Sequence, residues 1–240
     1  MIVPIEFHDN LPKRKHDFAV CTIPANKYAM DHLNVTRPLI LEYANKYEAD
    51  YIELTGDQCP SYPMYNKYRL EQVTSVYRKT LYLDCDVVVN PIAPNIFDNF
   101  VEEKMYFYNE WMGLRSSNKL VFDGQNKERA QIIEMFPWLS NDGRESIQPN
   151  CGVMLIPQFL SNFYSQPKVP YPKIWCFDQH YLILNLNKDQ YEMIDWRYNL
   201  EFMINGFWDK INQAYFIHLN GIKPNSRRIE LLRQITNIIR

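Results

Sequence analysis

Two aspartates within a largely apolar segment are the residues of this sequence with the clearest potential for chemistry. Asp84 and Asp86 lie in the run TLYLDCDVVV, which begins at Thr80. Residues two apart on a strand point to the same side, so two such carboxylates repel each other unless a positive charge compensates them. Oxygen ligands of this kind suit Mg²⁺ or Mn²⁺. The pattern indicates a divalent-cation site, although an Asp-x-Asp pair is also common in capped turns.

The segments around this pair alternate between the patterns of strands and helices. In chain order they predict a strand at 18–23, a helix at 28–47, a strand at 50–54, a helix at 67–77 and a strand at 80–89. This alternation is typical of a parallel α/β sheet, in which ligands bind at the carboxyl ends of the strands. If the last of these strands ends near Asp84, the two carboxylates lie at that edge.

The rest of the chain continues the same kind of pattern without a repeat or an obvious linker. It predicts strands at 105–111, 151–156 and 215–218, and helices at 127–136, 178–186 and 227–240. We therefore expect one domain, 1–240, with 1–17 as a lead-in. The polar segment 112–148 is a long insertion between core strands, and we expect it to build the acceptor side of a site.

Composition excludes several classes of protein. The 240 residues are 46% apolar and 22% charged, with a net charge of −2, which is ordinary for a folded globular chain and does not favour a nucleic-acid partner. The five cysteines have no zinc-site spacing, and their odd number predicts reduced thiols and a cytoplasmic location. The basic, amphipathic segment 227–240 could contact a membrane surface, but packing on its own domain is the favoured interpretation.

The order of several short motifs resembles that of family eight glycosyltransferases, the glycogenin and bacterial galactosyltransferase group. The matching segments are NKYRL from Asn66, YRK from Tyr77, LYLDCD from Leu81, NCGVM from Asn150, Asp178-Gln179 and HLNGIKP from His218. The resemblance covers about residues 18–224. Lys223 follows Gly221 by two residues where the family has three, and Ile183 occupies the place of a family asparagine.

The resemblance implies a GT-A fold, a Rossmann-like α/β fold with a mostly parallel central sheet flanked by helices. It also implies a metal-dependent transferase that moves a hexose from a UDP-sugar to a glycan or other hydroxyl acceptor, with retention of configuration at the anomeric carbon. The implied metal is Mn²⁺ or Mg²⁺, and a histidine beside the carboxylates favours Mn²⁺. The implied metal ligands are Asp84, Asp86 and His218. The implied nucleotide- and sugar-binding residues are Ile23, Ala25, Asn26, Tyr28, Lys67, Cys85, Asn150, Gly152, Gly221 and Lys223.

The same resemblance assigns a role in catalysis to Asp178 and Gln179. Asp178 would accept hydrogen bonds from hydroxyls of the transferred sugar, and Gln179 would present an amide oxygen near the anomeric carbon. Tyr28 would stack on the uracil, and Lys223 would place a positive charge on the diphosphate.

Other functions share some of these features. A sugar-nucleotide nucleotidyltransferase would normally carry a glycine-rich loop after its first strand, and the segment from Ile23 to Lys27 contains no glycine. A glycoside hydrolase needs paired carboxylates without a metal. The sequence does not exclude a non-catalytic module that binds sugar nucleotides. An inverting transferase would need a base, for which Asp123, Asp142 and Asp178 are the candidates.

Overall fold

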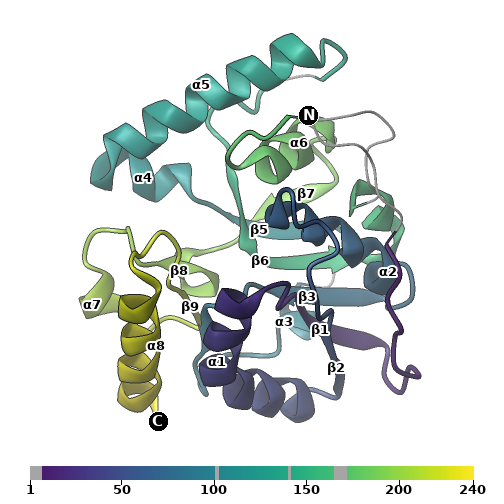
Figure 1. Cartoon of the computed structure of the whole chain (residues 1–240), viewed down its shortest axis with the longest axis vertical. Coiled ribbons are helices and arrows are strands. Elements are labelled where there is room, and N and C mark those ends of the chain that lie inside the picture. Colours follow the sequence, from purple (N-terminus) through teal and green to yellow (C-terminus); the bar gives the residue numbers. More distant parts are fainter. Residues whose placement is uncertain (1–6, 101–102, 140–141, 165–171) are drawn as a thin grey trace.

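A six-stranded mixed sheet lies at the centre of the computed structural model, which describes residues 7–100, 103–139, 142–164 and 172–240 (Figure 1). The strand order is β2 (Ala49–Glu53), β1 (Phe18–Thr22), β3 (Lys79–Leu83), β6 (Pro149–Pro157), β5 (Met105–Asn109) and β7 (Tyr191–Met193). Strand β6 is antiparallel to both of its neighbours, β3 and β5, while the other neighbouring pairs are parallel. The mixed α/β architecture agrees with the predicted fold class.

A second, smaller sheet lies beside the first. It contains β4 (Val87–Val89), β9 (Phe216–His218) and β8 (Leu200–Glu201), in that order. The pairing of β4 with β9 brings Val87 opposite His218. Residues about 130 positions apart in the sequence are therefore neighbours in space.

The helices cover the sheets and connect their strands. They are α1 (Lys27–Lys46), the 3₁₀ helix η1 (Pro63–Arg69), α2 (Leu70–Thr74), α3 (Ile96–Asn99), α4 (Trp111–Ser117), α5 (Lys119–Met135), η2 (Gln158–Tyr164), α6 (Phe177–Asn185), η3 (Trp196–Tyr198), α7 (Phe207–Lys210) and α8 (Asn225–Ile239). In Figure 1, α5 and α6 lie on one side of the large sheet, and α1 and α8 lie on the other.

Alternation along the strands divides the buried side chains into two cores. Successive side chains of a strand point to opposite faces. Leu81 accordingly packs in the core that includes residues of α1 and α8, whereas its neighbour Tyr82 packs in the core that includes residues of α2, α5 and α6. Both faces of the sheet are thus buried, which explains why its strands read as continuous apolar runs.

The predicted single strand 80–89 is wrong, because the chain forms two strands here. Strand β3 ends at Leu83 in the large sheet and β4 begins at Val87 in the small one, with a turn closed by the Val87 N–H and the Asp84 carbonyl at 3.1 Å. Both strands are fully buried, so the apolar pattern runs through the break. Asp84 and Asp86 lie on the turn, and not on one side of a strand as predicted.

Two further segments differ from the sequence-based expectation. The predicted helix 67–77 is the 3₁₀ helix η1 followed by the short α2, which ends at Thr74. The insertion 112–148 is mostly helical in its first part, where α4 and α5 meet at Asn118. The backbone N–H of Asn118 donates to the Leu114 carbonyl at the end of α4, and its side chain caps α5 by accepting the Val121 N–H. Residues 140–141 of this insertion and 1–6 of the lead-in lie outside the described residues.

Helix α8 packs on the domain as the favoured interpretation predicted. Leu231, Leu232 and Ile235 are buried in the core that α8 shares with α1. In the part of the chain that the structure describes, no helix combines the length and apolar character needed to cross a membrane.

Candidate functional site

The turn that carries both aspartates is held from three sides. The Asp84 N–H donates to the Gly152 carbonyl on β6 at 2.8 Å, and the Asp86 carbonyl accepts from the Leu219 N–H after β9 at 3.1 Å. Between them, the Cys85 carbonyl accepts from the Thr36 hydroxyl of α1 at 2.9 Å. The seam between the two sheets therefore fixes the backbone from which both carboxylates project.

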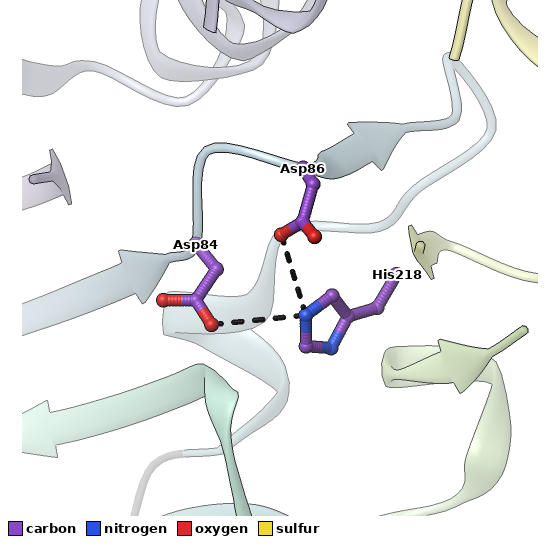
Figure 2. Close-up of side chains that lie close together, drawn as sticks. All are labelled: Asp84, Asp86 and His218. Atoms are coloured by element: carbon purple, nitrogen blue, oxygen red, sulfur yellow. Dashed lines mark ion pairs between the residues drawn. The ribbon is translucent and has the colours of Figure 1, made fainter. Parts of the chain in front are cut away.

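His218 joins the two aspartates at this seam (Figure 2). Its Nε2 lies 3.4 Å from Asp86 Oδ1 and 3.7 Å from Asp84 Oδ2. One ligand atom from each of the three residues lies within 4.8 Å of the others. Two carboxylates and an imidazole so arranged fit a divalent cation of the Mn²⁺ type.

The charges around Asp86 favour its ionised form. Burial acts to raise the pKa of Asp86, but His218 and Arg228 outweigh it, so that this pKa lies below its ordinary value. An ionised carboxylate is the form that a metal ion binds.

Gly152 makes room for the histidine. A Cβ atom at this position would lie 2.1 Å from His218 Cε1, far inside van der Waals contact. Gly152 is therefore a packing requirement of the His218 ring, and it does not line the cavity described below.

Lys67 connects the aspartate turn to α6. Its Nζ donates to the Cys151 carbonyl at 3.0 Å and lies 3.5 Å from Asp84 Oδ1 and 3.6 Å from Asp178 Oδ2. Burial opposes the charge on this lysine, but the two carboxylates outweigh it and raise the pKa of Lys67. The fold thus brings Asp178 near the metal site through a shared ammonium group.

Asp178 and Gln179 begin α6 but have different surroundings. Asp178 is paired with Lys67 and does not line the cavity, and burial raises its pKa. Gln179 lines the cavity, and its Oε1 accepts a hydrogen bond from Gln148 Nε2 at 2.9 Å.

A cavity of about 610 Å³ opens in front of Asp84, Asp86 and His218, the metal-ligand group. It brings together most of the residues that the sequence singled out: Ile23, Ala25, Asn26, Tyr28, Lys67, Asp84, Cys85, Asp86, Asn150, Gln179, His218, Gly221 and Lys223. The size is within the range of small-molecule sites.

The first loop of the cavity combines a structural and an exposed residue. The Asn26 side chain accepts the Ala29 N–H at 3.0 Å and so caps α1. Tyr28, in the first turn of the same helix, is 63% exposed at the cavity. A capped helix start places this ring where it can cover a flat ligand.

Glu110 is a cavity residue that the sequence analysis missed. It is 3% exposed and accepts from Asn150 Nδ2 at 2.9 Å and from Gln125 Nε2 at 2.5 Å. Burial raises the pKa of Glu110 to about 7, in spite of these two hydrogen bonds. A carboxyl group that holds a proton near neutral pH can donate to a ligand as well as accept from it.

The orientation of both amides requires a carboxyl group at this position. Asn150 Oδ1 already accepts from the Gly152 N–H and from Asn199 Nδ2, so its Nδ2 must face Glu110. Gln125 Oε1 accepts from Trp111 Nε1, so its Nε2 must face Glu110 as well. An amide at position 110 would set one N–H group against another.

Other cavity residues also escaped the sequence analysis. Trp175 is 60% exposed at the cavity, and Val121 and Gln125 of α5 line it. Arg228 reaches Asp86 from the start of α8, with Nη1 2.9 Å from Oδ2. In the sequence, Arg227-Arg228 opens an amphipathic helix and resembles an ordinary solvated pair.

Comparisons with known proteins agree with this arrangement at the level of the fold. No protein-family model matches the chain, and no curated protein matches it. Among solved structures, the chain is similar to a glycosyltransferase involved in glycosylation of the major capsid of PBCV-1, with 15% identity and a TM-score of 0.62 over 90% of this chain and 98% of that chain.

A second similar structure is the WbbM bifunctional glycosyltransferase. The identity is 11% and the TM-score 0.62, over 95% of this chain and 52% of that chain, so this chain spans about half the length of WbbM. The chain therefore has a glycosyltransferase fold, with a candidate metal site at an Asp-x-Asp turn.

Proposed function

We propose that this protein is a metal-dependent glycosyltransferase that moves a hexose from a nucleoside-diphosphate sugar, most simply a UDP-sugar, to the hydroxyl group of a glycan or other acceptor. The observation that carries the proposal is the joining of Asp84, Asp86 and His218 at one edge of a cavity within a glycosyltransferase fold. The motif order that resembles family eight supports the same reaction.

Transfer of the sugar requires a site that stabilises the negative charge of the diphosphate leaving group. The bond between the anomeric carbon and the diphosphate oxygen breaks, and a bond to the acceptor oxygen forms. The proton of the acceptor hydroxyl passes to the departing nucleoside diphosphate. When bound, a divalent cation would act as a Lewis acid toward the diphosphate leaving group. Asp84, Asp86 and His218 would hold it, and the cationic side chains Lys223 and Arg228 line the same cavity.

The sugar would lie deeper in the cavity, between the metal-ligand group and α6. Gln179, Asn150 and Glu110 line this region with polar groups that can bind hydroxyls. Asp178 would act through Lys67, to which it is paired at 3.6 Å. Tyr28 would mark the nucleotide end, because its exposed ring lines the cavity from the first turn of α1 and can stack on a base.

Retention of configuration is the outcome that the resemblance to family eight implies, and none of the three bases predicted from the sequence is placed to serve an inverting reaction. Asp123 is bound to Lys119 on the exposed side of α5, and Asp142 is exposed; neither residue lines the cavity. Asp178 is already paired with Lys67. Among the described residues, the one cavity carboxyl besides Asp84 and Asp86 is Glu110, so Glu110 is the residue that an inverting reaction would need as its base.

The decisive experiment is calorimetry of the full chain with UDP, in the presence of Mn²⁺ and then of excess EDTA. We expect binding with Mn²⁺ and its loss with EDTA, and the same loss in Asp86→Ala, with Asp123→Ala as an exposed matched control. Equal affinity with and without metal would refute metal dependence. A panel of UDP-sugars, assayed for release of UDP, then identifies the donor.

We also propose a cytoplasmic location for this protein. All five cysteines are buried and free. Unpaired thiols are typical of a reducing compartment such as the cytoplasm.

A further inference from the structure

Arg228 reaches the metal-ligand group from the first turn of α8. Its Nη1 donates to Asp86 Oδ2 at 2.9 Å, while Nε and Nη2 both donate to the Ile222 carbonyl, at 3.2 and 2.8 Å. The side chain is 20% exposed and lines the cavity. One guanidinium group therefore links Asp86 to the loop that carries Gly221 and Lys223.

The two carboxylate oxygens of Asp86 have different partners. Oδ2 accepts from Arg228, and Oδ1 faces His218 Nε2 at 3.4 Å. Asn225 binds His32 of α1 through its side chain, which fixes the start of α8. Because Arg228 is held at both ends, it fixes which Asp86 oxygen is available to a cation.

The protein supplies each aspartate of the turn with a cationic partner. Lys67 Nζ lies 3.5 Å from Asp84 Oδ1, and Arg228 Nη1 lies 2.9 Å from Asp86 Oδ2. A cation bound by the same carboxylates would lie close to both of these positive groups, and like charges a few ångströms apart repel each other appreciably even at the effective dielectric constant of a protein surface. A divalent cation that enters the site must therefore bind beside two positive groups.

We propose that Arg228 is a positioning residue that sets the metal affinity of the site: it holds Asp86 by one oxygen and keeps a free divalent cation weakly bound, so that the cation binds tightly only together with an anionic ligand in the cavity. The first half depends only on the contacts of Arg228. The second half rests on the proposed function, in which the anionic ligand is the diphosphate of the donor.

The test of the first half is titration of Mn²⁺ alone into the full chain, without nucleotide. Arg228→Gln removes the charge, and we expect it to bind Mn²⁺ about 10-fold more tightly, or ~1.4 kcal/mol. Arg228→Lys keeps the charge and should stay within about threefold of the wild type. Arg227→Gln is the matched control, because Arg227 is an exposed neighbour paired with Glu230.

A purely structural role predicts the opposite pattern. Arg228 would then hold the ligands in place, so both Arg228→Gln and Arg228→Lys would bind Mn²⁺ more weakly. Unchanged or weaker Mn²⁺ binding by Arg228→Gln overturns the proposal. If that variant does not fold, as judged by thermal unfolding in EDTA, Arg228→Met gives the same test with a longer apolar stem.

The second half is tested by repeating the Mn²⁺ titration with saturating UDP. We expect UDP to tighten Mn²⁺ binding more in the wild type than in Arg228→Gln, and an equal gain in both proteins overturns this half. If no variant binds UDP, the proposed donor is wrong, but the titrations with Mn²⁺ alone still decide the role of Arg228.

Discussion

Gly152→Ala should disable the metal site without touching any of its ligands. The added Cβ would lie 2.1 Å from Cε1, 2.7 Å from Nδ1 and 2.8 Å from Nε2 of His218. Ordinary carbon–carbon contacts begin at about 3.5 Å, so the imidazole must move by roughly 1.4 Å. Metal–ligand distances tolerate deviations of only about 0.2 Å, so a ring displaced this far no longer completes the site.

Neither of the two strands involved can shift to relieve this clash. His218 belongs to β9, which is paired on one side with β4 and on the other with β8. Gly152 lies within β6, and its carbonyl accepts the Asp84 N–H at 2.8 Å. A shift of β6 would therefore displace Asp84, which is itself a candidate ligand.

The assay is calorimetric titration of Mn²⁺ in the presence of UDP, with thermal unfolding as a check on the fold. We expect Gly152→Ala to weaken Mn²⁺ binding by about 10–100-fold, a size typical of misplaced ligand orientation. Gly124→Ala is the matched control, since a Cβ at that position of α5 meets nothing within 4 Å.

A second variant tests the cause. If the clash acts through the histidine, then adding Gly152→Ala to His218→Ala costs nothing further, because the two changes remove one interaction. Mn²⁺ affinity of Gly152→Ala within about twofold of the wild type would refute the reasoning. Full additivity of the two changes would place the damage elsewhere in the sheet.

Four further changes test other parts of the site. Asp178→Asn should lower turnover by about 10²-fold, or ~2.7 kcal/mol of barrier, with little change in UDP affinity; joint loss of Mn²⁺ and UDP binding would instead make Asp178 part of the nucleotide site. Tyr28→Ala should raise the UDP dissociation constant several-fold, since base stacking contributes about 1–3 kcal/mol, and unchanged affinity would contradict the stacking role. Glu110, whose pKa burial raises from 4.5 to about 7, keeps its proton in the folded protein after the unfolded chain has released it, so wild-type stability should fall from about pH 5 to 7. Urea unfolding at a series of pH values should show that the difference in unfolding free energy between wild type and Glu110→Gln narrows by about 2 kcal/mol over that window, whereas a constant difference would argue against this titration. Val121→Arg on α5 should spare donor hydrolysis and reduce transfer to acceptors; loss of UDP binding would assign α5 to the donor side.

The sequence pattern predicted most strands because the same physics produces the pattern and the sheet. Strands buried on both faces require continuous apolar runs, and β1, β3 and β6 have them. That continuity also hid the turn at Asp84, since β4 is as buried as β3. Hydrophobicity reports burial, but it does not report which sheet a strand joins.

The candidate site was predictable where its residues lie in recognisable local motifs. Asp84, Asp86 and His218 came from such motifs and from their order, and the structure brings them together. Glu110 and Arg228 escaped because their neighbours in sequence give only a strand end and a solvated helix start. Their meaning depends on the partners Asn150 and Asp86, which lie 40 and 142 residues away.

The charges at the seam between the two sheets link these separate observations. Lys67 pairs with both Asp84 and Asp178, and Arg228 pairs with Asp86, so two cationic side chains face three carboxylates. Most of the negative charge of this group is therefore offset by the protein itself. A divalent cation alone would make the group net positive, whereas a cation that arrives with a diphosphate adds little net charge. The arrangement therefore favours joint binding of metal and anionic ligand over binding of either one. This is the behaviour expected of a site whose substrate carries its charge on the leaving group.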